Sequence, residues 1–78
     1  MEKLSLGLLR QARRRANVTV EEAALTVGRG SRSFIWRVES GITDIKVGDL
    51  LRLLKRYGKS VTDVFVRVPE GEDSYDIV

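Results

Sequence analysis

The chain has 78 residues, of which 14 are Lys or Arg and 11 are Asp or Glu, and its formal net charge at pH 7 is +3. This length accommodates one small domain. The sequence contains no cysteine and no histidine, which excludes disulfides and thiolate metal sites and removes the usual general base and zinc ligand. We therefore expect a protein that is not an enzyme and that uses no metal and no cofactor.

The charge is unevenly distributed along the chain. Residues 1–59 hold 13 Lys/Arg and 6 Asp/Glu, a net +7, whereas residues 60–78 hold 1 and 5, a net −4, and the two sums give the total of +3. A basic body indicates a polyanionic partner. A solvated basic surface with an incidental acidic tail gives the same pattern, so charge alone leaves both interpretations open.

Two helices are expected in the first part of the chain. Apolar residues at helical spacing predict a helix over residues 5–16, and Asn17 readily takes the left-handed conformation that ends a helix. Thr19 and Glu22 have the spacing of a capping box, which begins a second helix. Gly28 ends that helix because glycine tolerates a positive φ angle.

Three more helices are expected after this point. Ser31 is a good N-cap for a helix that ends at about Glu39. Leucines at helical spacing predict a fourth helix over residues 47–57, which Gly58 closes. Ser60 opens a last short helix. The side chains expected to face inward from it are Val61, Val64 and Phe65.

The pattern changes after Phe65, where an alternating stretch is followed by an acidic one. We expect residues 1–65 to form the domain and residues 66–78 to form a flexible acidic tail. The alternative is a strand or hairpin that pairs with another chain. The dimer contact is expected at Val64, Phe65 and this tail.

The third helix has two different faces. If Ile35 and Val38 face the core, the opposite face carries Arg32, Ser33, Trp36 and Arg37. A large exposed aromatic such as Trp36 usually marks an interface, and the alternative is a plain solvated face. Phe34 lies at the shoulder of the helix and is expected to pack within the protein rather than to contact a thymine methyl group.

Several short motifs follow one another along the chain. They are T-V-E-E-A-A from Thr19, then Gly28, Ser31, I-W-R-V-E-S-G at residues 35–41, Gly58, and S-V-T-D-V-F at residues 60–65. Together they resemble the Cro/repressor-type helix-turn-helix family over about residues 6–65. The resemblance implies an all-α fold, a compact five-helix bundle of the phage-repressor DNA-binding-domain type with a short C-terminal tail or strand.

The resemblance also implies which residues meet DNA. The base-reading positions correspond to Arg32, Ser33, Trp36 and Arg37. The residues expected along the phosphate backbone are Thr19, Ser31, Thr43, Lys46 and Gly48. Arg13 and Glu39 match a family ion pair that ties the first helix to the end of the recognition helix and positions it. The alternative for Arg13 is membership of a solvated basic run.

The chain departs from the family pattern in two places. Two residues separate Gly28 from Ser31 where the family usually has one, so the turn is one residue longer. Val20 occupies a position where the family often has a glutamine that touches the DNA backbone. The amides at the start of that helix remain able to meet a phosphate.

These observations predict sequence-specific binding of double-stranded DNA by a transcriptional regulator that acts as a homodimer. No apolar run approaches the roughly 20 residues of a membrane span, so we expect a cytoplasmic protein, nucleoid-associated when bound to DNA, with no membrane partner and no small-molecule ligand. The alternative is an antitoxin-like or other protein-interaction module, in which the tail or the Trp36 face binds a partner protein.

Overall fold

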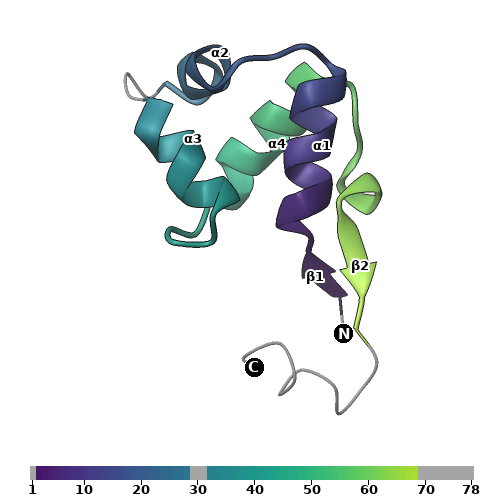
Figure 1. The fold of residues 1–78 in the computed structure, drawn as a ribbon. Coiled ribbons are helices and arrows are strands. Elements are labelled where there is room, and N and C mark those ends of the chain that lie inside the picture. Colours follow the sequence, from purple (N-terminus) through teal and green to yellow (C-terminus); the bar gives the residue numbers. More distant parts are fainter. Residues whose placement is uncertain (1, 29–31, 69–78) are drawn as a thin grey trace.

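The computed structural model describes residues 2–28 and 32–68. Four α-helices account for most of these residues: α1 (Leu6–Arg15), α2 (Val20–Thr26), α3 (Arg32–Glu39) and α4 (Val47–Tyr57). Two short strands, β1 (Glu2–Leu4) and β2 (Phe65–Arg67), pair antiparallel, and a single 3-10 turn, η1 (Val61–Asp63), precedes β2. The strand pair projects from the end of the molecule where α1 begins (Figure 1).

Local capping sets the ends of the helices, largely as the sequence predicts. The Ser5 hydroxyl accepts a hydrogen bond from the amide three residues on at the start of α1, and Asn17 has a φ of 57° just beyond its end. Thr19 and Glu22 form the predicted capping box at the start of α2. Gly58 closes α4 with a φ of 73°, a conformation that favours glycine.

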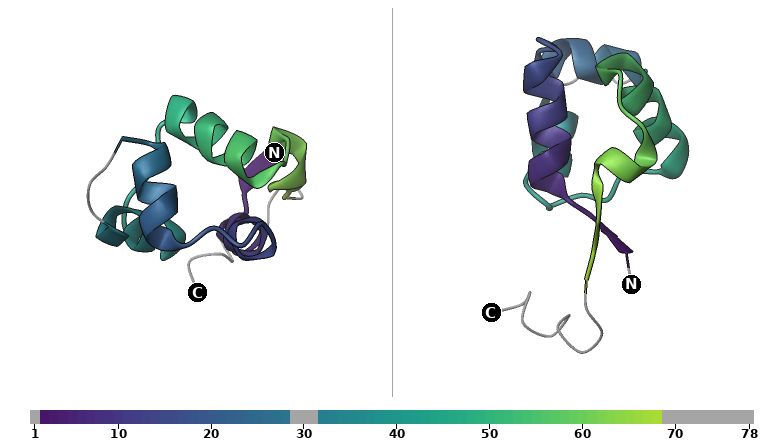
Figure 2. Two further views of the ribbon diagram at one scale, coloured as in Figure 1. Left: turned by 90° about the horizontal axis from the view of Figure 1, so that it is seen from above. Right: turned by 90° about the vertical axis from the view of Figure 1, so that its right-hand side faces the viewer.

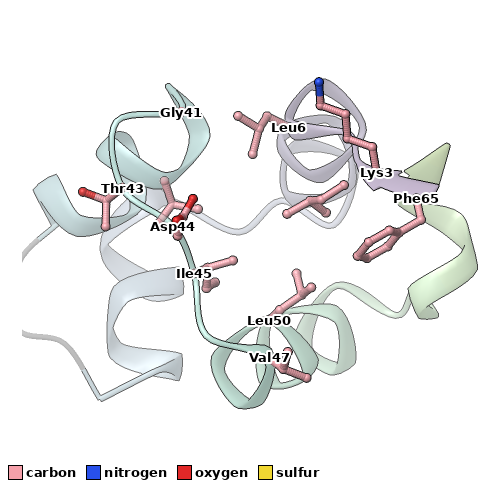
Figure 3. Close-up of a pocket in the computed structure, with 11 residues that line it drawn as sticks. Lys3, Leu6, Gly41, Thr43, Asp44, Ile45, Val47, Leu50 and Phe65 are labelled. Carbon is pink, nitrogen blue, oxygen red and sulfur yellow. The ribbon is translucent and has the colours of Figure 1, made fainter. Parts of the chain in front are cut away.

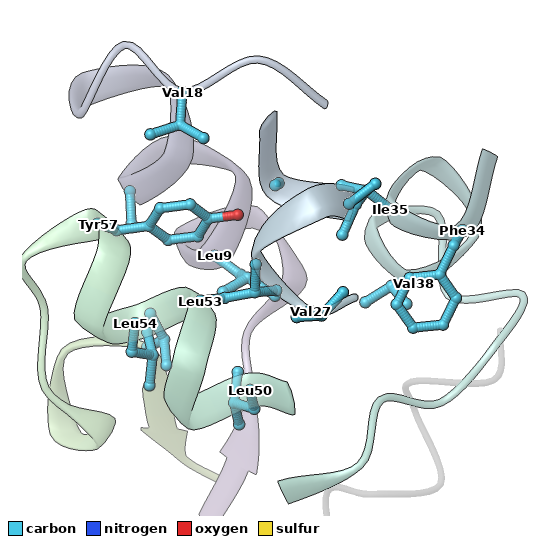
Figure 4. Close-up of a cluster of buried hydrophobic side chains, with 14 residues drawn as sticks. Leu9, Val18, Val27, Phe34, Ile35, Val38, Leu50, Leu53, Leu54 and Tyr57 are labelled. Carbon is cyan, nitrogen blue, oxygen red and sulfur yellow. The ribbon is translucent and has the colours of Figure 1, made fainter. Parts of the chain in front are cut away.

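The core lies between the four helices, where α2 packs against α3 and α4, and α1 packs against α3 and α4 (Figure 2). Ala23 and Ala24 are small, which allows α3 to approach α2 closely. The largest fully buried side chains, several of which Figure 4 shows, are Leu9, Ile35, Val38, Leu53, Leu54 and Val64. Burial of these apolar groups is the main stabilising term for a domain of this size.

The predicted count of five helices is wrong. The described residues contain four α-helices, and the segment after Ser60 is one 3-10 turn rather than a fifth helix. Ser60 and Asp63 form a capping box there, but the chain enters β2 two residues later, before a second turn can form. A three-residue turn buries little, so Val61 is 42% exposed where an inward position was expected.

The fold is mostly helical rather than purely α-helical, because the two ends of the domain form a small sheet. Glu2 pairs with Arg67, Lys3 with Val66, and Leu4 with Phe65. The strand considered as the alternative for the tail is thus present at Phe65–Arg67, but its partner is the chain's own N-terminal segment. The rest of the tail, residues 69–78, lies outside the described residues.

The expected dimer contact at Val64 conflicts with its position in the core. Val64 is only 1% exposed, and its carbonyl accepts a hydrogen bond from the Ser5 amide at 2.7 Å. A side chain buried in its own domain has no surface to offer a second copy. Phe65, the next residue, is half-buried.

None of the helices within residues 2–28 and 32–68 has the length and apolar character needed to cross a membrane.

Candidate nucleic-acid interface

The inner face of α3 is fixed against the rest of the domain. Ile35 and Val38 are 1% and 2% exposed, as the helical spacing predicts. Phe34 is 8% exposed and belongs to the same core, so the expectation that it packs within the protein is confirmed. These contacts set the rotation of the helix about its axis, and they leave a defined set of side chains on the outside.

The outer face of α3 carries the four side chains predicted to read bases. Trp36 is 58% exposed and the Arg32 side chain is 74% exposed, and Ser33 and Arg37 are exposed as well. Val20, Arg32, Ser33 and Trp36 line a hollow of about 280 Å³ between the starts of α2 and α3. The face therefore combines hydrogen-bond donors with apolar surface.

The Arg32 guanidinium is near a carboxylate of α2. Its Nη1 lies 3.8 Å from Oε1 of Glu21, and the Glu21 side chain is 57% exposed. An ion pair of this length between solvated side chains contributes little free energy. Arg32 is thus held loosely, and replacing Glu21 by another anion as its partner costs little free energy.

The far end of α3 is held tightly by α1. Arg13 donates from Nε to Oε2 of Glu39 at 2.7 Å and from Nη2 to Oε1 at 3.2 Å, and its Nη1 donates to the Val18 carbonyl at 2.9 Å. Glu39 is 7% exposed and Arg13 is 9% exposed. The hydrogen bonds to the Glu39 carboxylate raise the pKa of the Arg13 guanidinium above its ordinary value, against the opposing effect of burial.

Arg10 is a second partner of Glu39 that the sequence analysis did not assign. Its Nε lies 3.4 Å from Oε1 of Glu39, and its Nη2 lies 3.4 Å from the Glu39 carbonyl oxygen. Arg10 and Arg13 are three residues apart and so share one face of α1, which is the signal that sequence reasoning missed. The carbonyl contact also places a positive charge at the C-terminal end of α3, where it is electrostatically favourable.

The loop after α3 is anchored to the helix it leaves. The Arg37 carbonyl accepts hydrogen bonds from the amides of Ile42 at 2.9 Å and Thr43 at 3.3 Å. Gly41 has a φ of 79°, and a Cβ there would lie 3.3 Å from a Leu6 methyl carbon. Thr43 is half-buried, and Lys46 is exposed. The turn therefore holds the residues predicted to meet phosphate in a defined place.

The start of α4 is open for an external partner. Lys46 is the N-cap residue, and its side chain makes no capping hydrogen bond. Gly48 is exposed in the first turn. Amides at a helix start carry partial positive charge and bind anions. Lys46 and Gly48 thus both lie exposed at the start of this helix.

Thr19 is already engaged within α2. Its Oγ1 accepts from the Glu22 amide at 3.1 Å, and its own amide donates to Oε1 of Glu22 at 2.9 Å. These bonds hold the pKa of the Glu22 carboxyl below its ordinary value. The Thr19 hydroxyl keeps one proton to donate, but its amide is occupied. Ser31, predicted as a backbone contact, and the longer turn at residues 29–30 lie outside the described residues.

Within residues 2–28 and 32–68, no group of three or more His, Cys, Asp or Glu side chains has the arrangement of a metal site. The sequence-predicted residues instead gather on α3, on the loop that follows it, and at the starts of α2 and α4. A family model described as a helix-turn-helix domain matches residues 7–64. Searches of curated proteins and of solved structures found no match to the chain.

Proposed function

We propose that this chain, which belongs to the helix-turn-helix domain family, is a sequence-specific double-stranded DNA-binding protein that regulates transcription as a homodimer. The observation that carries the proposal is the outer face of α3, where two arginines, a serine and a tryptophan are exposed on a helix whose inner face is buried. A helix presented in this way fits the major groove.

Arg32 and Arg37 are the groups proposed to read guanine. Each guanidinium is able to donate two hydrogen bonds to guanine O6 and N7, which discriminates against other bases by about 1–3 kcal/mol. Arg32 leaves its weak contact with Glu21 when it does so. Ser33 is small enough to approach a base edge or a backbone oxygen.

Trp36 and the Val20 side chain supply the apolar part of the proposed reading surface. They line the same hollow of about 280 Å³, and the apolar group that DNA presents in the major groove is the thymine C5-methyl. We therefore expect thymine at the position of the operator that faces this hollow. Replacing that thymine with uracil, which lacks only the methyl group, tests the contact directly.

Thr43, Lys46 and the Gly48 amide are proposed to meet the phosphate backbone, and Thr19 contributes its hydroxyl proton. Such contacts set the register and orientation of a protein on the duplex without reading sequence. The ion pairs of Glu39 with Arg13 and Arg10 act one step away from DNA, because they hold the end of α3 and hence the outer face at a fixed orientation.

One domain of this size reads only a few base pairs, so specificity requires more than one copy. A homodimer on a two-fold-related operator, with half-sites about one helical turn apart, meets this need.

The experiment that tests the proposal is selection of bound duplexes from a random pool. We expect a consensus with two inverted half-sites, and absence of any enriched sequence would refute DNA specificity. Comparing Arg37→Ala with Arg14→Ala distinguishes the loss of base recognition from the loss of one positive charge. Both variants remove one exposed arginine, but only Arg37 lies on the outer face of α3. Loss of preference at one base position only in Arg37→Ala supports the assignment.

A salt titration distinguishes DNA binding from the protein-interaction alternative. The logarithm of the DNA affinity should fall linearly with the logarithm of salt concentration, with a slope of about −0.9 for each phosphate contacted. Association with an antitoxin-type partner through the tail or the Trp36 face should depend less on salt. A shallow slope on duplex DNA together with tight, salt-resistant binding of a protein would favour that alternative.

A further inference from the structure

Helix α1 carries four arginines and no acidic residue. The arginines are Arg10, Arg13, Arg14 and Arg15. Arg13 is buried and bonds to Glu39 and to the Val18 carbonyl, so the fold itself uses its charge. The charge of the other three arginines is compensated only in part, and it makes the outside of α1 a basic surface.

Arg10 has a weak hold on its carboxylate. Its Nε lies 3.4 Å from Oε1 of Glu39, an oxygen that already accepts from Arg13 at 3.2 Å. The Arg10 side chain is 43% exposed, and a guanidinium has several N–H donors. One carboxylate thus faces two guanidinium groups, and a net positive charge remains beside the end of α3.

Arg14 extends this charge along α1. It follows Arg10 by four residues and therefore lies on the same side of the helix. It is exposed, and its guanidinium has no ion-pair partner among the residues that the structure describes. A cation in the last turn of a helix is favourable, so α1 accommodates this unpaired charge without a carboxylate beside it.

The two arginines border a hollow of about 340 Å³ on the surface of α1. Its other lining residues are Gly7, Gln11 and Arg15, so no carboxylate lines it within the described part of the chain. Guanidinium groups offer positive charge together with N–H donors, and this combination suits the oxygens of a phosphate group. The hollow is therefore chemically suited to a phosphate.

The larger hollow between β1, the α3–α4 loop and α4 has a different character (Figure 3). Its volume is about 530 Å³, and its lining is mostly apolar, with contributions from Leu4, Leu6, Ile45, Leu50 and Phe65. The two charged residues in that lining, Lys3 and Asp44, have opposite signs. A phosphate is thus favoured at the α1 hollow and not at this one.

The row formed by Arg10 and Arg14 lies between two regions that are proposed to meet the DNA backbone. Arg10 contacts the Glu39 carbonyl at the end of α3, from which the loop with Thr43 departs. At the other end of the row, α1 ends at Arg15, and Thr19 caps α2 four residues later. The row is therefore continuous with the surface that the proposed function turns toward DNA.

We propose that Arg14 contacts a phosphate of the duplex that α3 reads, and that Arg10, which remains on Glu39, adds its charge to the same patch. The inference rests on the proposed function and adds a contact from α1 to those from the loop and the helix starts. A phosphate contact carries no base preference, so it strengthens binding to every duplex alike.

A salt titration of Arg14→Gln tests the contact. The slope of log affinity against log salt should become shallower by about 0.9, and affinity at about 0.1 M salt should fall roughly eightfold. Both changes should be equal for the selected operator and for a random duplex of the same length. Arg14→Lys keeps the charge and should keep the slope.

The matched control is Lys55→Gln, which removes the same charge from an exposed position on α4 that lines neither hollow. We expect this variant to keep the salt slope of the original chain. Urea denaturation of each variant verifies that the domain is folded under the conditions of the titration. A purely structural role of Arg14 would lower stability without changing the slope.

Uncharged methylphosphonate linkages, placed one at a time in the operator, identify the phosphate. We expect one linkage at which neutralisation weakens binding of the original chain by roughly eightfold. The same linkage should not weaken binding of Arg14→Gln any further, because the contact is already lost in that variant. This comparison is a double-mutant cycle between one side chain and one phosphate.

The outcomes separate this contact from the proposed function. A shallower slope in Arg14→Gln, together with one linkage that couples to Arg14, supports the contact. Operator binding with an unchanged slope in Arg14→Gln overturns the contact and leaves the proposed function intact. Tighter operator binding by Arg14→Gln also overturns it, and would indicate that these arginines hold an acidic protein segment that competes with DNA. A chain that binds no duplex refutes the proposed function and this contact with it.

Discussion

The two ends of α3 are held in opposite ways. At its end, Glu39 is 7% exposed and bonds to Arg13 at 2.7 Å and to Arg10 at 3.4 Å. At its start, the Arg32 side chain is 74% exposed and lies 3.8 Å from Glu21. An ion pair between arginine and glutamate occurs at both ends of α3. The buried pair at the end fixes the helix, whereas the solvated pair at the start is easily replaced by other contacts.

This difference indicates how a small domain combines rigidity with binding. A buried pair is costly to break because each charge is left without a partner away from water. A solvated ion pair contributes little free energy, so its arginine readily exchanges the carboxylate for another anion. The domain fixes the orientation of α3 through Glu39, whereas it holds Arg32 only by a weak, solvated contact, which the proposed function exchanges for DNA.

The largest expected effect follows from breaking the fixed end. Glu39→Ala should lower the free energy of unfolding by about 3–5 kcal/mol, because Arg13 would remain buried without its carboxylate. Urea denaturation measures the loss. Glu21→Ala is the matched control at the other end and should stay within about 0.5 kcal/mol of the original chain.

The pair energy itself needs a double-mutant cycle. Arg13→Ala, Glu39→Ala and the double variant give the coupling between the two side chains. Since neither charge is left alone in the double variant, it should be less destabilised than the sum of the singles. Strictly additive losses of stability would show that Arg13 and Glu39 are not coupled, and that this ion pair does not hold the end of α3.

The next effect concerns the outer face. Arg32→Ala and Arg37→Ala should each weaken binding to the selected operator by about 1–3 kcal/mol while changing the free energy of unfolding by less than about 0.5 kcal/mol. Fluorescence anisotropy with labelled duplexes measures the first quantity and urea denaturation the second. A large loss of stability in either variant would show that the outer face is structural, and the comparison of the two ends would fail.

Most helix ends and the two faces of α3 were predictable because their signals are local. The Thr19–Glu22 capping box and Gly58 act within a few residues, and Ile35 faces inward while Trp36 faces outward as helical spacing requires. These features depend on hydrogen bonds and periodicity that a short stretch of sequence displays.

The errors arise where distant segments decide the structure. β1 forms because Leu4 meets Phe65, and nothing near Leu4 signals a partner about 60 residues away. The same pairing draws the chain out of η1 before a fifth helix forms. At the site, the Arg13–Glu39 contact followed from the resemblance, whereas the Arg10 contact depends on how α1 crosses α3.

A smaller effect is expected from Tyr57, which lies beside the fixed end. Its hydroxyl is buried and has no hydrogen-bond partner among the described residues (Figure 4). Burial raises the pKa of the phenol from 10.0 to about 12, with a further contribution from the Glu39 charge. Tyr57→Phe should therefore leave stability at pH 7 unchanged or raise it by up to about 1 kcal/mol.

The same residue makes a prediction about alkaline pH. The pKa of Tyr57 is higher in the folded chain than in the unfolded chain. The stability that comes from keeping the phenol neutral is therefore complete below pH 10 and is lost as the pH rises from 10 to about 12. Urea denaturation should show a lower free energy of unfolding at pH 11 than at pH 8 for the original chain. The difference should be smaller in Tyr57→Phe. Equal declines for both would mean that the hydroxyl is not buried beside Glu39.

The smallest expected effect is at the exchangeable end, and it has the opposite sign. Glu21→Gln removes a carboxylate that competes with DNA for Arg32, so operator affinity should rise by a few tenths of a kcal/mol, about twofold. The gain should vanish in an Arg32→Ala background and shrink as salt increases, because both charges are solvated. A gain that persists without Arg32 would mean that Glu21 repels phosphate directly. In that case the gain does not come from releasing Arg32, and the exchange proposed for the start of α3 is wrong.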